Sequence, residues 1–167
     1  METALEWILT NSYKADMISY LSAHPEDFEE AIKLAISNKQ PYSWRAAWLL
    51  WSFIEENDYR VQGYVKNIID SISEKNDDQQ RELLKILQKM EINEEIEGLI
   101  FNHCVTVWEK IKKKPSVRFN AFKVIVKIAQ KHPDLSHEFI FLTQNQYMDS
   151  LSPTVRKSIY GMIKKFR

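Results

Sequence analysis

The chain has 167 residues, of which 44% are apolar and 28% are charged, a composition typical of a globular domain with a substantial core. Its 23 Lys/Arg and 23 Asp/Glu residues cancel, but residues 1–100 carry a net charge of −9 and residues 101–167 one of +9. No apolar run reaches the ~18 residues of a membrane-spanning helix, and the acidic N-terminus lacks the basic and apolar regions of a signal peptide.

Helices are the predicted elements throughout, because three glycines in the whole chain are too few for many hairpins or phosphate-binding loops. Apolar periodicity predicts a first helical segment over residues 3–22 with a break near Asn11, after which Ser12 is expected to cap a second piece. Pro25, followed by two acids, predicts the start of the next helix because proline and acids favour the first helical turn.

A tryptophan-rich helix is predicted to begin near Ser43, after Pro41. Trp44, Trp48 and Trp51 recur at i, i+4 and i+7 and so share one face, while alanine and leucine occupy much of the other side. A helix that is apolar nearly all round is a buried one. We therefore expect the tryptophans to pack in the core rather than to form an aromatic cage or a stacking platform. Trp44 is the one expected to be partly exposed.

The remaining segments show the same helical periodicity and are separated by short connections, which suit antiparallel helix neighbours. Phe139–Leu142 is the most strand-like run, but it sits inside a longer helical pattern and is expected to form a fully buried helix. The predicted helices span residues 59–73, 77–90, 94–112, 116–131, 134–149 and 153 to the end of the chain.

Four arginines indicate a repeat. Arg45, Arg81, Arg118 and Arg156 stand near the starts of four predicted helices, at spacings of 36, 37 and 38 residues. A period of this size is the signature of a helical repeat array. Arg118 and Arg156 also share their surroundings: each follows Pro-Ser-Val or Pro-Thr-Val, and each precedes small or apolar residues three and seven positions later.

This pattern resembles the HEAT-repeat family and its armadillo-like relatives, whose motif has a proline turn, then Val-Arg, then an alanine three and a leucine seven residues on. The resemblance covers about residues 26–166. It implies an all-α fold, an α-α superhelix of antiparallel helix pairs with about four repeats and eight to ten helices, in a single domain over residues 1–167. It also implies that the arginine-bearing helices line the inner, concave surface. Such domains mostly hold partners, and the fold alone implies no reaction.

The repeat arginines are expected to be structural. On a helical wheel Arg118 falls in the sector of Ala121 and Ile125, which is the packed side of its helix. An arginine in that place is expected to donate to carbonyl groups or to a carboxylate of the neighbouring repeat rather than to bind a ligand. The same role is expected of Arg45, Arg81 and Arg156.

The sequence holds no recognisable catalytic, metal-binding or cofactor-binding motif. His103 and Cys104 are adjacent, so on a helix their side chains diverge by about 100° and hold one metal ion poorly. Cys104 lies among apolar residues, which favours a buried, inert thiol over a nucleophile. As the only cysteine it precludes an internal disulfide, so a reducing, cytoplasmic location is expected. We expect no catalytic activity, no cofactor and no metal.

Two functions fit these features. The first is a scaffold for protein–protein interaction, because a surface built from repeated helices suits an extended partner. The acidic and basic halves would orient that partner or drive head-to-tail self-association. The second is nucleic-acid binding, because residues 110–131 contain eight basic residues and no acid. A HEAT-like fold grips the DNA backbone in the DNA-alkylation-repeat glycosylases, which this chain resembles only in helix-pair architecture. The scaffold is favoured, since the acidic first half would repel phosphate.

The candidate binding residues lie on the last two arginine-bearing helices and serve either kind of partner. Lys123, Lys127 and Lys131 recur every four positions and are expected on the exposed face, with Asn120 beside them. The full set is Asn120, Lys123, Lys127, Lys131, Lys157 and Lys164, joined on the last helix by Lys165 and Arg167.

Overall fold

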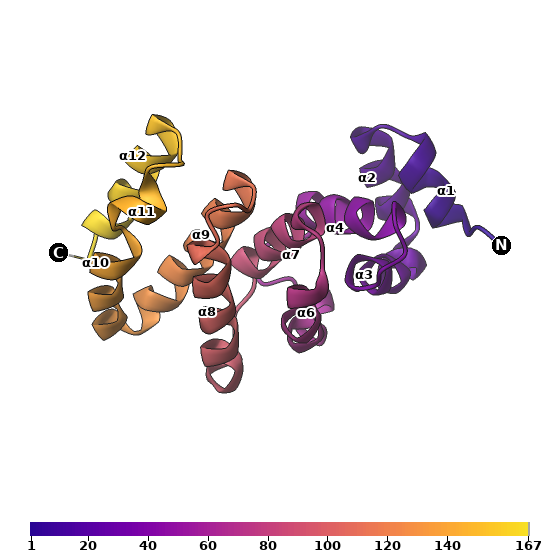
Figure 1. The fold of residues 1–167 in the computed structure, drawn as a ribbon. Helices are drawn as coiled ribbons and strands as arrows, with labels where there is room; N and C mark the ends of the chain where they lie inside the picture. Colours follow the sequence, from indigo (N-terminus) through magenta and orange to yellow (C-terminus); the bar gives the residue numbers. More distant parts are fainter. Residues whose placement is uncertain (167) are drawn as a thin grey trace. The chain divides into compact units, whose positions relative to one another are not determined.

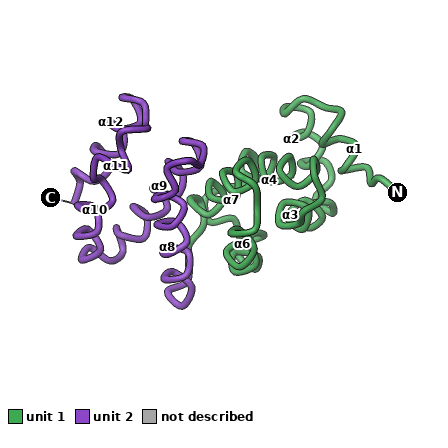
Figure 2. Tube along the Cα trace, in the orientation of Figure 1, with its two compact units in different colours: residues 1–91 green, residues 92–167 purple. Residues whose placement is uncertain are grey.

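A computed structural model describes residues 1–166, and all regular structure in them is helical (Figure 1). Twelve α-helices and three short 3-10 helices follow one another in these residues, with no strand among them. The predicted all-α fold is thereby confirmed. Two compact units divide the chain, residues 1–91 and 92–167 (Figure 2). This division leaves the single domain over residues 1–167 a prediction.

Unit 1 is built around α4, which packs against α1, α2, α3 and α7. A short connection joins α3 to α4, so the two helices form an antiparallel pair. The elements of the unit are α1 (Ala4–Asn11), α2 (Lys14–Ala23), η1 (Pro25–Asp27), α3 (Phe28–Ile36), α4 (Tyr42–Phe53), α5 (Tyr59–Gln62), α6 (Val65–Ser71), η2 (Ile72–Glu74) and α7 (Asp77–Lys89).

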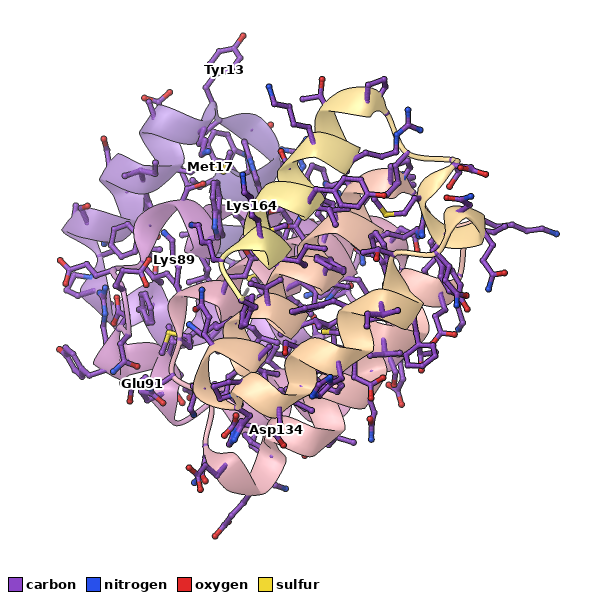
Figure 3. The ribbon with its side chains drawn as sticks, turned by 90° about the vertical axis from the view of Figure 1, so that its left-hand side faces the viewer. Tyr13, Met17, Lys89, Glu91, Asp134 and Lys164 are labelled. Atoms are coloured by element: carbon purple, nitrogen blue, oxygen red, sulfur yellow. The ribbon has the colours of Figure 1, made fainter. Side chains whose placement is uncertain are left out.

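The first helix begins at a capping box. The Thr3 hydroxyl accepts a hydrogen bond from the Glu6 N–H at 3.1 Å, and the Glu6 carboxylate accepts one from the Thr3 N–H at 3.2 Å. The predicted break after Asn11 is present, but the predicted cap at Ser12 is wrong. Tyr13 precedes α2 without a side-chain cap and projects into solvent (Figure 3).

Unit 2 has α8 and α9 as its central pair, with α10 and α12 packed against them. Its core contains Trp108, whose ring centroid lies 4.7 Å from that of Phe122 and whose indole N–H donates to the Leu142 carbonyl at 2.7 Å. The elements are α8 (Glu94–Glu109), α9 (Pro115–Lys131), η3 (Pro133–His137), α10 (Glu138–Leu142), α11 (Asn145–Met148) and α12 (Pro153–Lys164).

More helices form than the eight to ten expected because two predicted helices are broken. The segment over residues 59–73 is interrupted at Gly63, the residue type with the lowest helix propensity after proline. The segment over residues 134–149 is interrupted at Thr143, whose hydroxyl donates to the Phe139 carbonyl at 2.6 Å. A threonine bonded in this way competes with the continuing helix.

The strand-like run Phe139–Leu142 is helical, as predicted, but it is not fully buried. Phe139 and Leu142 face the core of unit 2, whereas Ile140 is 71% exposed and Phe141 is 59% exposed. The reason is geometric: α10 lies over the core with one side, and residues one and two positions along a helix turn away from that side.

Candidate functional site

Three tryptophans of α4 lie on one surface of unit 1 together with cations from α2, α4 and α7. Each of the three indoles is partly exposed. None is among the residues buried in the core of the unit. We call this surface the tryptophan face; it consists of Trp44, Trp48 and Trp51 with Lys14, Arg45 and Lys85.

The tryptophans of α4 pack less completely than predicted, because each indole is mostly buried but not fully enclosed. The helix buries Ala46, Ala47, Leu49 and Leu50 more completely. Alanine allows two helix backbones to approach closely, so the small-residue side of α4 packs against its neighbours and the bulky indoles are left at the rim. All three tryptophans, rather than Trp44 alone, are therefore partly exposed.

The cations lie against the indole rings. The Lys14 Nζ is 5.2 Å from the ring centroid of Trp48 and 5.5 Å from that of Trp51, and the Lys85 Nζ is 4.6 Å from that of Trp51. The Arg45 guanidinium lies 5.2 Å from the ring centroid of Trp44. These distances are within the range of cation–π attraction, about 6 Å. The indoles therefore hold positive charge over a partly apolar surface.

Some of these cations are also held by the fold. Arg45 donates to the carbonyl of Leu9 at 3.0 Å, at the C-terminal end of α1. Lys85 lies 3.6 Å from the buried carboxylate of Glu82. Lys14 differs from both, because it makes no hydrogen bond or ion pair within residues 1–166. Its contacts are the two indole rings, and its charge is available to a partner.

Lys89 adds a fourth cation at the C-terminal end of α4 (labelled in Figure 3). Its Nζ donates to the carbonyls of Trp51 at 2.7 Å and Ile54 at 3.1 Å, and it lies 5.2 Å from the Trp51 ring. A lysine in this place satisfies carbonyls that the end of a helix leaves unpaired. We therefore assign Lys89 to the fold rather than to the tryptophan face.

Every polar side-chain group of the tryptophan face is a hydrogen-bond donor. The indole N–H groups of Trp44, Trp48 and Trp51 donate to no acceptor within residues 1–166. Lysine and arginine have donors only. A surface of donors and aromatic rings complements a partner that is rich in acceptors and carries negative charge.

Four acids of unit 1 line an open pocket of about 570 Å³ between α1 and α3. Its carboxylates are already paired: Glu6 lies 2.6 Å from Lys39, Glu29 lies 2.9 Å from Lys33, and Glu26 is bonded to a histidine. The Lys39 ammonium lowers the pKa of Glu6, and the Lys33 ammonium lowers that of Glu29. The remaining carboxylate, that of Glu30, accepts a hydrogen bond from the Thr3 hydroxyl at 2.5 Å, so each carboxylate of the pocket already has a partner within it.

The lysines predicted on the exposed face of α9 differ in their surroundings. Lys123 and Lys127 are partly exposed, and the Lys123 Nζ lies 4.5 Å from the Phe119 ring. Lys131 is exposed but lies 3.1 Å from the Glu97 carboxylate. The expectation that Asn120 lies on the exposed face is wrong: its side chain is buried and donates to the Ser116 carbonyl at 2.8 Å. Asn120 shares its side of α9 with Val117 and Val124, three positions before and four after it, and both of these are fully buried.

The predicted lysines of α12, Lys157 and Lys164, are exposed (Lys164 is labelled in Figure 3). Lys165 follows the helix and is exposed as well. Arg167, which was expected to join them, lies outside the described residues.

The four repeat arginines bond to their own unit. Arg118 is fully buried and donates to the carbonyls of Trp108 and Tyr147, each at 2.7 Å. Arg156 donates to the Leu151 carbonyl at 2.8 Å. Arg81 is paired with Asp78 and Glu82 at 3.2 and 3.1 Å. With the Arg45 bond to α1, each guanidinium joins its helix to a neighbouring segment or stabilises the start of the helix.

Cys104 is fully buried in α8, and burial raises the pKa of its thiol far above the ordinary range. The neighbouring His103 is partly exposed, and burial together with the positive charges of Lys113 and Lys110 lowers its pKa. Within residues 1–166 no group of His, Cys, Asp and Glu side chains is arranged to hold a metal ion. None of the helices in this range combines the length and apolar character that a membrane crossing requires.

The sequence matches the family model of the HEAT repeat domain over residues 1–166. No curated protein and no solved structure matches the chain. The match covers nearly every residue and agrees with the helix pairs of both units and with the spacing of the four arginines. The chain therefore belongs to the HEAT repeat domain family.

Proposed function

We propose that this protein is a non-catalytic helical-repeat scaffold that binds a protein partner through the tryptophan face of unit 1. The observation that carries the proposal is the partial exposure of three adjacent indoles whose N–H groups have no acceptor within residues 1–166. The fully buried residues of α4 are others, so part of each ring remains accessible to a partner. Tryptophan and arginine at a partly exposed surface are the residues that most often dominate the binding energy of protein interfaces.

Affinity capture with the full-length tagged chain tests the scaffold function. The wild-type chain should recover a protein in stoichiometric amount from its native host. Trp48→Ala should reduce that recovery at least about tenfold, because a central interface tryptophan contributes about 2 kcal/mol or more. Lys66→Glu on α6 is the matched control, because Lys66 is exposed and lies outside the tryptophan face. Equal recovery with Trp48→Ala and the wild type would show that the face is not the binding surface.

A second candidate function is nucleic-acid binding through the lysines of α9 and α12. Its supporting observation is that α9 carries no acid, while Lys123 and Lys127 are partly exposed and Lys157 and Lys164 are exposed. Lys131, the other member of the predicted set, lies beside Glu97. Its charge is offset by that carboxylate, which weakens the case for a continuous phosphate-binding stripe.

Titration of labelled duplex and single-stranded DNA tests this second candidate. Several phosphate contacts should give binding at ~50 mM salt that weakens at least about tenfold at ~200 mM. Joint reversal of Lys123 and Lys127 to Glu should abolish it, whereas Lys66→Glu should not. Absence of binding at the lower salt contradicts the nucleic-acid function.

The cellular location that we propose is the cytoplasm. The single, fully buried thiol of Cys104 supports a reducing compartment, where disulfides are rare.

A further inference from the structure

We infer that the partner of the tryptophan face is a short, extended acidic segment of a protein in which acidic and apolar side chains alternate. The inference rests on the proposed scaffold function and adds the chemistry of the partner. It is carried by charge complementarity, by the length of the face and by the acids that bound it.

The charged side chains that make up the face are all cations, although one of them, Lys85, lies 3.6 Å from the buried carboxylate of Glu82. Residues 42–53 of α4 contain no acid. Lys14 makes no ion pair within residues 1–166, and the Arg45 guanidinium has a single carbonyl acceptor, that of Leu9. A carboxylate placed between these two cations would gain charge-assisted hydrogen bonds, which are about twice as strong as neutral ones. The indole N–H groups supply further donors to the same acceptors.

The length of the face suits a few residues of extended chain. Trp44 and Trp51 are seven positions apart on α4, which corresponds to about 10 Å along the helix axis at the α-helical rise. An extended strand covers that distance in about three residues. Neighbouring side chains of such a strand point to opposite sides, so alternate residues face the indoles. The face therefore selects one or two side chains against the rings, flanked by carboxylates that reach the cations.

Acids close to the face limit the length of an anionic partner. Glu55 and Glu56 follow α4 directly and are exposed, and Asp16 lies in the first turn of α2 beside Lys14. Residues 1–91 hold 16 Asp/Glu against 10 Lys/Arg, a net charge of −6. Screening at physiological salt acts over about 8 Å, so a short segment on the face escapes most of this repulsion. A long nucleic acid would extend past the face and meet these acids, which favours the acidic protein segment.

A defined peptide tests the inference on the full-length protein. The probe is a fluorescein-labelled peptide with Glu-Leu-Glu-Leu-Glu between Gly-Ser flanks, and the matched control carries Gln-Leu-Gln-Leu-Gln. We expect the Glu peptide to bind, to change the tryptophan fluorescence and to weaken when salt is raised from ~50 to ~200 mM. The neutral peptide should bind at least about tenfold more weakly, because it loses the charge-assisted bonds. Single-stranded oligothymidine, titrated in the same way, tests whether the face binds nucleic acid instead.

Two substitutions locate the binding site. Lys14→Glu should weaken the Glu peptide at least about tenfold, since it replaces an attraction by a repulsion. An acid in the first turn of α2 favours the helix, so this variant should remain folded, which circular dichroism checks. Trp48→Leu should weaken both peptides, and Lys66→Glu should change neither. The inference is overturned if the Glu peptide does not bind, if Lys14→Glu acts no more strongly than Lys66→Glu, or if oligothymidine binds more tightly than the Glu peptide.

The peptide titration and the affinity capture together distinguish a failure of the acidic-partner inference from a failure of the scaffold function. If Trp48→Ala abolishes capture of the native protein partner while the Glu peptide fails to bind, the acidic chemistry is wrong and the scaffold function stands. If the Glu peptide binds at the face while Trp48→Ala leaves capture unchanged, the captured partner uses another surface and the scaffold function fails. The peptide result in that case still supports an acid-binding face.

Discussion

The guanidinium of Arg118 lies inside unit 2 and is held by oxygen atoms of neutral groups. Its donors reach the carbonyls of Trp108 and Tyr147 and the hydroxyl of Ser150, and its charge lies 4.5 Å from the Trp108 ring. Burial lowers its pKa. The arrangement joins α8, α9, α11 and the turn before α12, so removing the side chain leaves several acceptors without their donor.

Arg118→Ala should lower the free energy of unfolding by about 3–5 kcal/mol, because it creates a cavity and leaves buried carbonyls without donors. Arg118→Lys should also lower the free energy of unfolding, though by less than Arg118→Ala, since one ammonium does not reproduce the planar set of guanidinium donors. Arg156→Ala is the comparison: Arg156 is partly exposed with one carbonyl acceptor, so about 1 kcal/mol is expected. Urea unfolding followed by circular dichroism measures all three. Equal losses at the two arginines would contradict the buried network.

Trp48 gives a second measurement at the scale of one residue. A fully buried tryptophan loses about 3–5 kcal/mol on substitution by alanine. Trp48 is partly exposed but buries most of its surface, so its loss should be about 2–3 kcal/mol. Urea unfolding of Trp48→Ala provides the measurement, and a loss below about 1 kcal/mol would mean that the indole faces solvent.

At the scale of the elements, the sequence predicts well where the helices lie. It predicts poorly which side of α4 is buried. Caps and periodicity locate α7 and α9 to within a residue or two, because each of these helices has one clearly apolar side that must pack against the core. For α4 the stripe is ambiguous: both of its sides are apolar, and only the neighbouring helices decide which one packs. The small Ala46 and Ala47 pack more closely and are fully buried, whereas the tryptophans remain partly exposed.

The cations of the tryptophan face were missed for a related reason. Lys14 and Lys85 come from helices far from α4 in sequence, and neither belongs to a motif. The available signal was the spacing of Arg81, Lys85 and Lys89, which places three cations on one side of α7. That spacing becomes informative once α7 is known to pack beside α4.

Helix α8 contains a glycine that its structure does not need. Gly98 lies inside the helix without a positive φ, and a Cβ at this position would contact nothing. Gly98→Ala should therefore raise the free energy of unfolding by about 0.5–1 kcal/mol, the difference in helix propensity. Gly161→Ala in α12 should behave in the same way. Thermal unfolding measures the gain, and a decrease in stability would mean that the helix requires the glycine.

For the whole molecule, the charge pattern predicts a loss of stability in acid. Arg60 lowers the pKa of the buried Asp58 to about 2, and lysines lower the pKa values of Glu6 and Glu29. A carboxyl group whose pKa is lower in the folded chain stabilises the fold above its ordinary pKa. That stabilisation is lost as the pH falls through the folded value.

The free energy of unfolding should therefore decrease between about pH 4 and pH 2, with Asp58 contributing about 2 kcal/mol. Asp58→Asn should flatten this part of the profile, because the amide does not titrate. Denaturant titrations at several pH values provide the measurement. An unchanged slope in Asp58→Asn would assign the acid lability to other carboxylates.

Because Cys104 is fully buried, the reactivity of its thiol measures how often the surrounding helices open. A thiol that is fully enclosed and protonated does not react with alkylating reagents until α8 separates from its neighbours. The rate at which iodoacetamide labels this single cysteine therefore counts opening events in residues 92–167. The partly exposed tryptophans of α4 can report binding at the same time, so partner association and local unfolding can be followed in one sample without an introduced label.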